Sequence, residues 1–324
     1  MKKIGMIMAA AWLLCGCVEE GADLGVARAP ILYGEEAGNA DFGSVVALVI
    51  SRGNGDNAYY AYCSGVLIAE NVVLTAAHCL VDDEGFPFGS LYRDHKIAVV
   101  ADVDAGAPEA GRVYEIDRYR VNSDYDSLTN MNDIGVVWLR SAVAADVARP
   151  LPVVTDFSKV KAIVDQKQDV MFVGYGVDES GAYNKRRVFT GTLDAWCTQS
   201  WCEISDVRMP YGTLKSSLKD GGPCSGDSGG AVLVMMDGVQ QVVAVTSSGD
   251  EHCADFSIAT SVAAHQRWLN DTLYPKKKDS GCAAMVRTEN YGLFELMFMI
   301  LILLGKFANR KRSVIKRISI KSSL

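Results

Sequence analysis

The segment from Gly221 to Val232, GGPCSGDSGGAV, most strongly limits what this chain can fold into. So much glycine, together with a proline, is unsuited to the interior of a helix or strand and predicts an irregular turn. Bare backbone at this turn lets the amides of Gly226 and Ser228 point at one spot. We expect these two amides to form an oxyanion hole, a set of N–H donors that stabilises negative charge developing on an oxygen.

Short apolar runs separated by Gly, Asn, Asp and Pro fill the chain from Ile31 to Ile258. The runs span residues 44–50, 65–77, 96–103, 133–139, 168–176, 230–236 and 240–248. Repeated short strands with turns between them predict an all-β barrel or sandwich. One convincing helical pattern, with a period near 3.6, follows at residues 261–274.

Composition narrows the classes of function. The chain has 324 residues, 49% of them hydrophobic, which is enough to bury a large core. Its formal net charge of -7 argues against nucleic acid as a partner, because phosphate binding needs a basic face. The four histidines are scattered and the cysteines lack the paired spacings of zinc sites, so we expect no metal site and no cofactor.

The first 17 residues, MKKIGMIMAAAWLLCGC, have the pattern of an export signal, with a basic start, a short apolar run and small residues at the end. Within them LCGC resembles the lipobox of bacterial lipoproteins, which would place a lipid on Cys17, although Cys15 is unusual at its position. A plain secretory signal with a soluble product is the alternative. Residues 18–30 would then form a pro-segment.

The other end of the chain combines an apolar stretch, Leu293–Leu304, with a dense Lys/Arg tail. A basic tail stays cytoplasmic, which leaves the residues upstream outside the cell. The apolar part is shorter than the roughly 20 residues of a stable spanning helix. We therefore interpret residues 291–324 as a short hydrophobic helix with a basic tail, acting as a membrane anchor or a processed sorting tag rather than as a core helix. Residues 275–290 would be a linker, in which Cys282 resembles the cysteine of bacterial C-terminal sorting motifs.

Export places the chain in an oxidising compartment, where cysteines are expected to form disulfides. Apart from the end segments, six cysteines remain, an even number for three bridges: Cys63, Cys79, Cys197, Cys202, Cys224 and Cys253. Cys79 directly follows His78, and a bridge from it to Cys63 would hold that histidine in place.

A serine hydroxyl is a poor nucleophile unless a base takes its proton, a third group orients the base, and donors stabilise the oxyanion. Three segments supply these parts: LTAAHC with His78, NDIGVVWL with Asp133, and GDSGG with Ser228. Asp124 and Asp126 compete with Asp133, but neither is followed by an unbroken apolar strand.

With these motifs the chain resembles the trypsin-like (chymotrypsin-fold) serine peptidases from about Ile31 to Tyr274. TAAHC and GDSGG carry the resemblance jointly, and the order His, Asp, Ser is that of the family. The resemblance implies two antiparallel six-stranded β-barrels with a C-terminal helix. It also implies that His78 is the general base, Asp133 its orienting carboxylate and Ser228 the nucleophile that forms an acyl-enzyme.

Members of this family mature by cleavage, and the new amino terminus inserts beside the aspartate that precedes the nucleophile. By resemblance, Ile31 would be that terminus and Asp227 its buried partner, so an activating protease is an expected partner. Pro30 before Ile31 is unusual, and cleavage after Arg28 would leave two extra residues, so the activation route stays open.

The family builds its specificity pocket from residues before the nucleophile and from a later strand. The positions assigned to substrate binding by the resemblance are Gly222, Ser247, Gly249 and Ser257. Gly222 stands where trypsins carry an aspartate, so trypsin-like specificity is disfavoured. Small or medium apolar substrate side chains fit such a pocket, whereas Asp250 and Glu251 favour a cationic one. The resemblance also implies the disulfide Cys224–Cys253. Cys197 and Cys202 lack the wide separation of the family's third bridge, and we expect them to pair with each other.

We interpret the chain as a secreted or envelope-tethered serine endopeptidase that acts on proteins or peptides and matures from a zymogen. A non-catalytic binding module on the same fold is one alternative, and a structural or adhesion lipoprotein is another. The set of His78, Asp133 and Ser228 with the oxyanion turn weighs against both.

Overall fold

The computed structural model describes residues 31, 34–52, 59–81, 95–178, 180–218 and 221–275. All of them belong to one compact unit that ends at Pro275. The expected export signal with Cys17, the pro-segment, the linker after Pro275 with Cys282, and the C-terminal segment lie outside the described residues.

The described residues form mainly short strands. In the first half they are β1 (Glu35–Glu36), β2 (Val45–Arg52), β3 (Tyr59–Ala69), β4 (Val72–Thr75), β5 (His95–Val100), β6 (Val113–Val121) and β7 (Gly135–Leu139). In the second half they are β8 (Asp169–Gly174), β9 (Arg187–Thr192), β10 (Ala195–Trp196), β11 (Trp201–Ile204), β12 (Val207–Pro210), β13 (Thr213–Ser217), β14 (Ala231–Met236), β15 (Val239–Gly249) and β16 (Phe256–Ser261). The helices are α1 (Asn39–Phe42), α2 (Phe157–Asp165) and α3 (Gln266–Leu273), with 3-10 turns η1 (Ala77–Cys79) and η3 (Ala263–His265).

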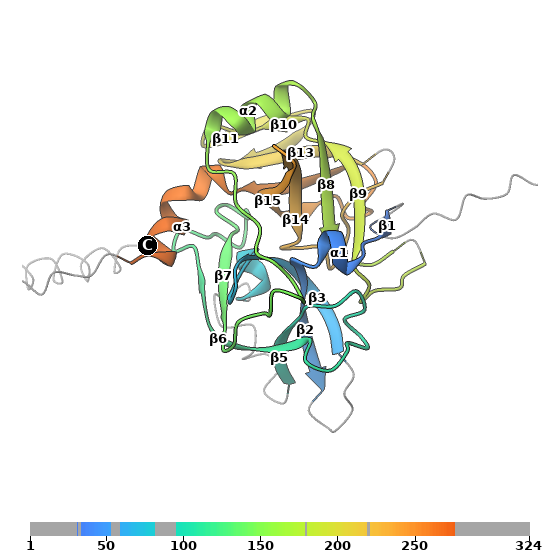
Figure 1. Cartoon of the computed structure of the whole chain (residues 1–324). Coiled ribbons are helices and arrows are strands. Elements are labelled where there is room, and N and C mark those ends of the chain that lie inside the picture. Colours follow the sequence, from blue (N-terminus) through green and yellow to red (C-terminus); the bar gives the residue numbers. More distant parts are fainter. Residues whose placement is uncertain are drawn as a thin grey trace, which may run out of the picture. The chain divides into compact units, whose positions relative to one another are not determined.

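The first lobe is a closed antiparallel barrel in the order β2-β3-β4-β7-β6-β5 (Figure 1). Its strands are rich in valine, whose branched side chain suits a pleated, buried surface. All four residues of β4 are buried, as are four of the five residues of β7. The runs predicted at residues 44–50, 65–77, 96–103 and 133–139 coincide with strands of this barrel, so these predictions are confirmed.

The second lobe is an antiparallel sheet of eight strands in the order β1-β9-β8-β14-β15-β16-β13-β10. Its six central strands are extended at the two ends by the two-residue strands β1 and β10. Strands β9 and β13 also contact each other, so the sheet curls toward a barrel. The two-barrel expectation is thus confirmed, with one barrel closed by hydrogen bonds and the other lengthened at its ends.

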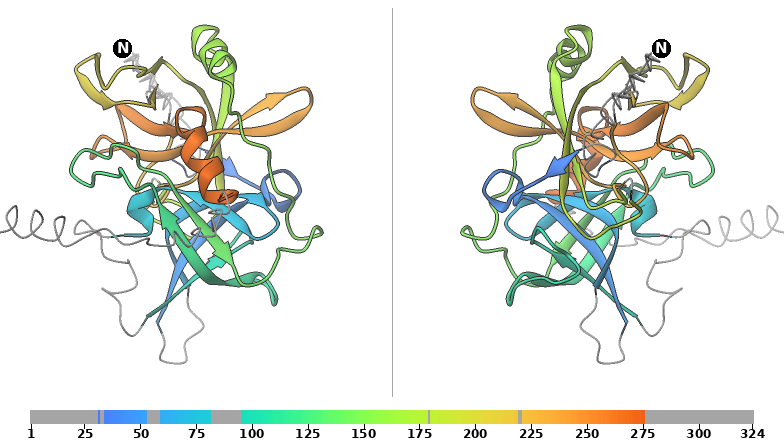
Figure 2. Two further views of the ribbon diagram at one scale, coloured as in Figure 1. Left: turned by 90° about the vertical axis from the view of Figure 1, so that its left-hand side faces the viewer. Right: turned by 90° about the vertical axis from the view of Figure 1, so that its right-hand side faces the viewer.

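One hydrophobic cluster joins the two lobes. It contains Val45 and Leu74 from the first barrel, Leu233 and Val245 from the second, and Leu269 from α3, all at most 2% exposed. Figure 2 shows α3, in orange, lying where the two barrels meet. Segments that follow strand ends of both barrels therefore converge at this junction, which is where the candidate site lies.

The helices differ in part from the prediction. The helix expected at residues 261–274 begins later, because Ser261 still belongs to β16 and the 3-10 turn η3 precedes α3. Helix α2 was not predicted, although Asp156 caps it by accepting a hydrogen bond from Ser158 N at 2.7 Å. Within the residues that the structure describes, no helix is both long and apolar enough to cross a membrane.

Arg186 is fully buried between the lobes and binds the segment that follows the N-terminal strand β1. Its Nε donates to the carbonyl of Ala37 at 3.0 Å, and its NH1 donates to the carbonyl of Val45 at 3.0 Å. Its remaining nitrogen donates to Asn39 Oδ1 at 2.5 Å, and NH1 also donates to the hydroxyl of Tyr175 at 3.2 Å. The planar guanidinium thus satisfies several acceptors at once, which a lysine ammonium cannot do in this geometry.

Replacing Arg186 with methionine should lower the free energy of unfolding by about 2–4 kcal/mol, because buried acceptors lose their donor. The measurement is urea denaturation at neutral pH in a Ser228→Ala background, which removes the nucleophile expected from the sequence. Arg187→Met, at the neighbouring half-buried position, is the matched control and should cost less. Equal stabilities of the two variants would contradict the role assigned to Arg186.

Candidate active site

His78 and Asp133 are brought together by the pairing of β4 with β7. Thr75 at the end of β4 pairs with Gly135 at the start of β7, so the turn after β4 and the residue before Ile134 are neighbours. Nδ1 of His78 lies 2.8 Å from Oδ2 of Asp133, and the backbone N–H of His78 donates to Oδ1 at 3.0 Å. A carboxylate only accepts, so Nδ1 carries the proton and Nε2 is left as an acceptor.

The electrostatics of His78 follow from this contact. Burial lowers the pKa of His78, but the charge of Asp133 and its hydrogen bond to the ring outweigh burial and raise the pKa above the ordinary 6.5. The imidazolium form is therefore stabilised, which is what a base needs when it takes a proton during a reaction.

A β-bulge in β15 aims a third group at the pair. The register between β15 and β16 shifts between Thr246 and Ser248, and a bulge of this kind redirects a side chain. The hydroxyl of Ser247 donates to Oδ2 of Asp133 at 2.6 Å. The fully buried carboxylate of Asp133 is thus satisfied by three donors from the protein. The sequence assigned Ser247 to substrate binding and did not predict this contact.

Ser228 lies on the glycine-rich turn before β14 and is tied to the first barrel. Its carbonyl oxygen accepts a hydrogen bond from Ser64 N at 2.7 Å and lies 3.6 Å from Cys79 Sγ. Cys79 directly follows His78, and the Cys63–Cys79 disulfide joins it to the residue before Ser64. The backbone of Ser228 is therefore held beside the segment that carries His78. Nothing in the sequence motifs pointed to Ser64.

Steric crowding explains why the turn contains glycines at positions 226 and 229. Gly226 has φ +93°, and a Cβ there would lie 2.9 Å from the backbone of Gly176. Gly229 has φ +78°, and its Cβ would lie 2.1 Å from Oγ1 of Thr75. In the part of the chain that the structure describes, the amides of Gly226 and Ser228 donate to no acceptor. They are therefore available to an oxyanion.

Asp227 is buried without a cationic partner. Oδ1 accepts from Gly176 N at 2.8 Å and Oδ2 from Cys224 N at 2.9 Å, and no ion pair with Asp227 occurs among the described residues. Burial raises the pKa of Asp227 to about 7, although the two amide hydrogen bonds act in the opposite direction. Ile31 is 1% exposed in the hydrophobic cluster of the second lobe, and no hydrogen bond joins it to Asp227 in the described structure.

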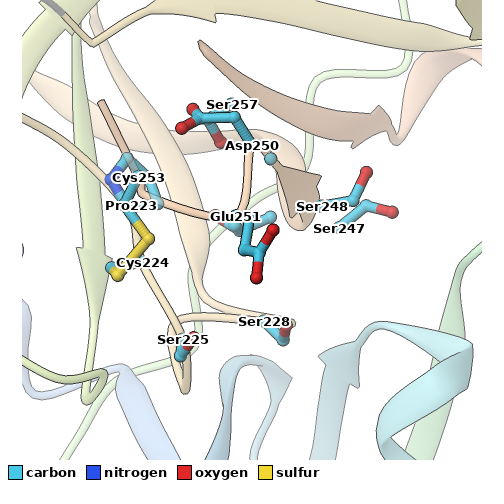
Figure 3. Close-up of a pocket in the computed structure, with 12 residues that line it drawn as sticks. Pro223, Cys224, Ser225, Ser228, Ser247, Ser248, Asp250, Glu251, Cys253 and Ser257 are labelled. Atoms are coloured by element: carbon cyan, nitrogen blue, oxygen red, sulfur yellow. A yellow bond between two sulfur atoms is a disulfide. The ribbon is translucent and has the colours of Figure 1, made fainter. Parts of the chain in front are cut away.

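A cavity of about 320 Å³ opens beside Ser228 (Figure 3). It is lined by Pro223, Cys224, Ser225, Ser228, Thr246, Ser247, Ser248, Gly249, Asp250, Glu251, Cys253 and Ser257. Most of these residues are polar, and apolar side chains are few. Figure 3 shows Glu251 near the centre of the lining residues, with its carboxylate turned toward Ser228.

The two acids in this lining differ in their partners. Burial would raise the pKa of Asp250, but hydrogen bonds from backbone amides outweigh it and lower the pKa to about 2. The amides belong to His252, Ala254, Asp255 and Phe256. Glu251 is exposed and has no ion-pair partner among the described residues, so its carboxylate is free to meet a ligand.

The predicted pocket residues fall in two groups. Ser247, Gly249 and Ser257 line the cavity, whereas Gly222 is buried behind it, where a Cβ would lie 2.3 Å from Leu218. A second cavity of about 370 Å³ borders the other side of residues 247–249, between Thr129 and the β11–β12 hairpin. The end of β15 therefore runs between two hollows.

The three predicted disulfides are confirmed. The Cα atoms are 6.1 Å apart in Cys63–Cys79, 5.5 Å in Cys197–Cys202 and 5.3 Å in Cys224–Cys253. The sulfur atoms of Cys63 and Cys79, near His78, form a disulfide and are therefore not thiolates that could bind a metal.

The competing aspartates do not reach the histidine. Asp124 and Asp126 are exposed and make local contacts: the carbonyl of Asp124 accepts from Asn132 Nδ2, and the carboxylate of Asp126 accepts from Leu128 N. Asp133 alone of the three contacts His78 in the described structure.

Comparison with known proteins agrees with this geometry. The family model described as Trypsin matches residues 31–269. "Trypsin, alkaline B" of Manduca sexta is 30% identical over 220 residues, 65% of this chain and 77% of the relative. "Trypsin" of Phaedon cochleariae is 30% identical over 225 residues, 65% of this chain and 78% of the relative. "CLIP domain-containing serine protease B15" of Anopheles gambiae is 27% identical over 237 residues, 69% of this chain and 64% of the relative.

Proposed function

Because the chain belongs to the trypsin family of serine-type endopeptidases, we propose that His78, Asp133 and Ser228 are its catalytic triad. The observation that carries the assignment is the double contact between His78 and the fully buried Asp133, with the backbone of Ser228 held beside them. Residues 31–274 would form the peptidase domain.

In the proposed reaction Nε2 of His78 takes the proton of Ser228 as Oγ bonds to the carbonyl carbon of a peptide. The amides of Gly226 and Ser228 stabilise the oxyanion, and Asp133 stabilises the imidazolium. His78 then gives the proton to the leaving amine, the C–N bond breaks, and the acyl group remains on Ser228. Water, deprotonated by His78, attacks the acyl carbon, releases the acid and restores Ser228.

A fluorophosphonate probe tests this proposal, because only an assembled triad and oxyanion hole label the serine. The processed chain that begins at Ile31 should be labelled, and its Ser228→Ala variant should not. A binding module on the same fold would bind peptides without being labelled or cleaving them. A correctly processed chain that never labels would overturn the assignment.

The cavity beside Ser228 would hold the substrate side chain that precedes the scissile bond. The many polar lining residues and the carboxylate of Glu251, which has no ion-pair partner among the described residues, favour a cationic side chain over a small apolar one. Asp250 is engaged by backbone amides and is not available for this role. Gly222 supplies no charge, so recognition would differ from the arrangement that the family resemblance implies for trypsins.

Glu251→Gln should lower kcat/KM for peptides with lysine or arginine at that position by about tenfold, because one partly shielded charge pair is lost. The value for matching alanine peptides should not change. Asp255→Asn, in the same loop but outside the cavity lining, is the matched control. If Glu251→Gln affects lysine and alanine peptides equally, Glu251 does not select the charge.

Maturation would create a new amino terminus at Ile31, whose ammonium group would pair with Asp227. Two features of the unprocessed chain support this: Asp227 is buried and pairs with no cation among the described residues, and Ile31 has φ +41°, which is strained for a β-branched residue. Hydrolysis of the bond before Ile31 would remove the restriction on that angle and supply the missing cation.

Export would bring the chain to the cell envelope or beyond it. The three disulfides support an oxidising compartment. Attachment through a lipid on Cys17 or through the C-terminal segment, and sorting at Cys282, rest on sequence patterns alone. Intact mass and N-terminal sequencing of the protein from its native envelope test these steps, since a mature chain that begins at Ile31 excludes a retained lipid on Cys17.

A further inference from the structure

His265 occupies a buried position at the start of α3, close to the proposed triad and outside the proposed reaction. The residue is 4% exposed. Nδ1 lies 2.9 Å from the carbonyl oxygen of Ser261, and Nε2 lies 3.1 Å from Oδ1 of Asn132. The edge of the ring packs on Gly212, where an added Cβ would lie 3.0 Å from Cε1 of His265. The imidazole is thus fixed from three sides.

Asn132, the residue that precedes Asp133, is held at both ends of its side chain. Nδ2 donates to the carbonyl oxygen of Asp124 at 2.8 Å, and the other end meets His265. Its backbone has φ +57°, a left-handed conformation that needs support from its surroundings. The carbonyl of Asn132 then accepts from Ile134 N at 2.8 Å, which closes a tight turn around Asp133.

The donors and acceptors explain why a histidine suits this place. A carbonyl only accepts, so Nδ1 must donate to Ser261. A protonated ring also donates from Nε2 to Asn132 Oδ1. A neutral ring leaves Nε2 as an acceptor, so Asn132 must turn its amide toward the ring and release Asp124. In either protonation state the ring keeps one hydrogen bond to Asn132.

The charges around the ring are few. Burial lowers the pKa of His265, while the hydrogen bond to Ser261 and the negative charge of Asp133 act in the opposite direction. Asp133 is the charged group that acts on His265 through space. The same carboxylate raises the pKa of His78. The one buried carboxylate of Asp133 therefore acts on both histidines.

We propose that His265 is a positioning residue, which fixes Asn132 and thereby the carboxylate of Asp133 against His78. The proposal rests on the triad assigned under the proposed function. The contacts link η3, the turn between β16 of the second lobe and α3, to the turn before β7 of the first lobe, so docking of this C-terminal segment sets the geometry of Asp133. Substrate does not contact His265, because the residue is absent from the lining of the cavity beside Ser228.

The first test is kinetic, with active sites counted by fluorophosphonate labelling. His265→Phe keeps an aromatic ring of similar size but removes both ring nitrogens and their hydrogen bonds, and should lower kcat between about 10-fold and 100-fold with KM unchanged. His265→Gln retains an amide donor and should recover part of the loss. Leu269→Ala, on the same helix, should lower the melting temperature while kcat per active site stays the same.

A double-mutant cycle separates the route through Asn132 from a general effect on packing. Asn132→Gly keeps a residue that adopts a positive φ but deletes the side chain. If His265 acts through Asn132, the double variant should be no slower than the slower single variant. Fully additive losses, or a His265→Phe enzyme with the kcat of the parent, would overturn the proposal.

A second readout does not depend on turnover. In the Ser228→Ala chain, the pKa of the His78 ring can be followed by NMR. His265→Phe should lower this pKa toward 6.5, because a displaced Asp133 stabilises the imidazolium less. If the parent chain shows no activity but this shift occurs, the positioning role stands and the catalytic assignment fails. If the parent is active and the pKa does not move, the positioning role fails alone.

Discussion

Asp133→Asn is expected to lower kcat about 10,000-fold while leaving the fold intact. An asparagine can occupy the same buried space, but it presents a neutral amide to Nδ1 of His78 and to Ser247. The ring then loses the charge that stabilises its protonated form and the acceptor that keeps the proton on Nδ1. Peptide hydrolysis and the rate of fluorophosphonate labelling measure the loss.

The pH profile gives this prediction a second check. In the parent enzyme, activity should fall as the pH drops through the pKa of His78, which lies above 6.5 because of Asp133. In the variant the residual activity should fall at a lower pH. Asp124→Asn, an exposed aspartate nine residues upstream, is the matched control and should behave as the parent does. Comparable losses in both variants would mean that Asp133 does not orient the base.

The amino terminus at Ile31 is expected to have the second-largest effect. A chain cut so that Ile31 is the first residue should exceed by at least about 100-fold the kcat/KM of a chain cut after Arg28, which keeps Ala29 and Pro30. The reason is that only the first form can place an ammonium group beside Asp227 and so hold the oxyanion turn. Hydrolysis of one peptide by the two purified forms measures the ratio, and equal activities would exclude this route.

Asp227→Asn tests the other member of the proposed ion pair between the amino terminus of Ile31 and Asp227. In the form that begins at Ile31, the variant should lose about 100-fold to 1,000-fold in kcat, the size of a lost oxyanion donor. Activity of the parent form should also fall at alkaline pH, as the terminal amine loses its proton above its ordinary pKa near 8. An alkaline fall that persists unchanged in Asp227→Asn would point to another group.

In the unprocessed chain, Asp227→Asn should stabilise the fold at higher pH, whereas it should lower the activity of the processed chain. The pKa of Asp227 is raised from 3.8 to about 7 by burial, so the folded chain binds a proton more readily than the unfolded one. This contribution to stability is present below pH 3.8 and is lost as the pH rises through 7. The melting temperature of Asp227→Asn relative to that of the parent should therefore be higher at pH 8 than at pH 5. Ser228→Ala in both chains prevents digestion.

Much of the local structure was predictable because it follows from short segments. Valine-rich runs bounded by turn residues identified strands such as β4 and β7, since side-chain alternation and branching act over a few residues. Helix α2 was missed although Asp156 and the spacing of Val160, Ile163 and Val164 are typical of a capped amphipathic helix. Its apolar positions are few.

The candidate site also has a part that the sequence predicted and a part that it did not. The motifs around His78 and Asp133 predicted that these two side chains meet, and the structure holds the backbone of Ser228 beside the segment that carries His78. The choice between Asp250 and Glu251 could not be made from their positions in the chain. The choice depends on which carboxylate accepts hydrogen bonds from the loop amides. The fold of the loop after β15 directs these amides to Asp250.

The sequence by itself determined the family, the β-strands, the three disulfides and the candidate nucleophile, since each is encoded in neighbouring residues or in short motifs. Only the tertiary structure decided that Ser247 binds Asp133, that Arg186 holds the N-terminal segment, and that His265 reaches Asn132. These contacts join residues 114, 147 and 133 positions apart. Hydrogen bonds over such separations form only when two barrels and a helix dock, and no local pattern of side chains records them.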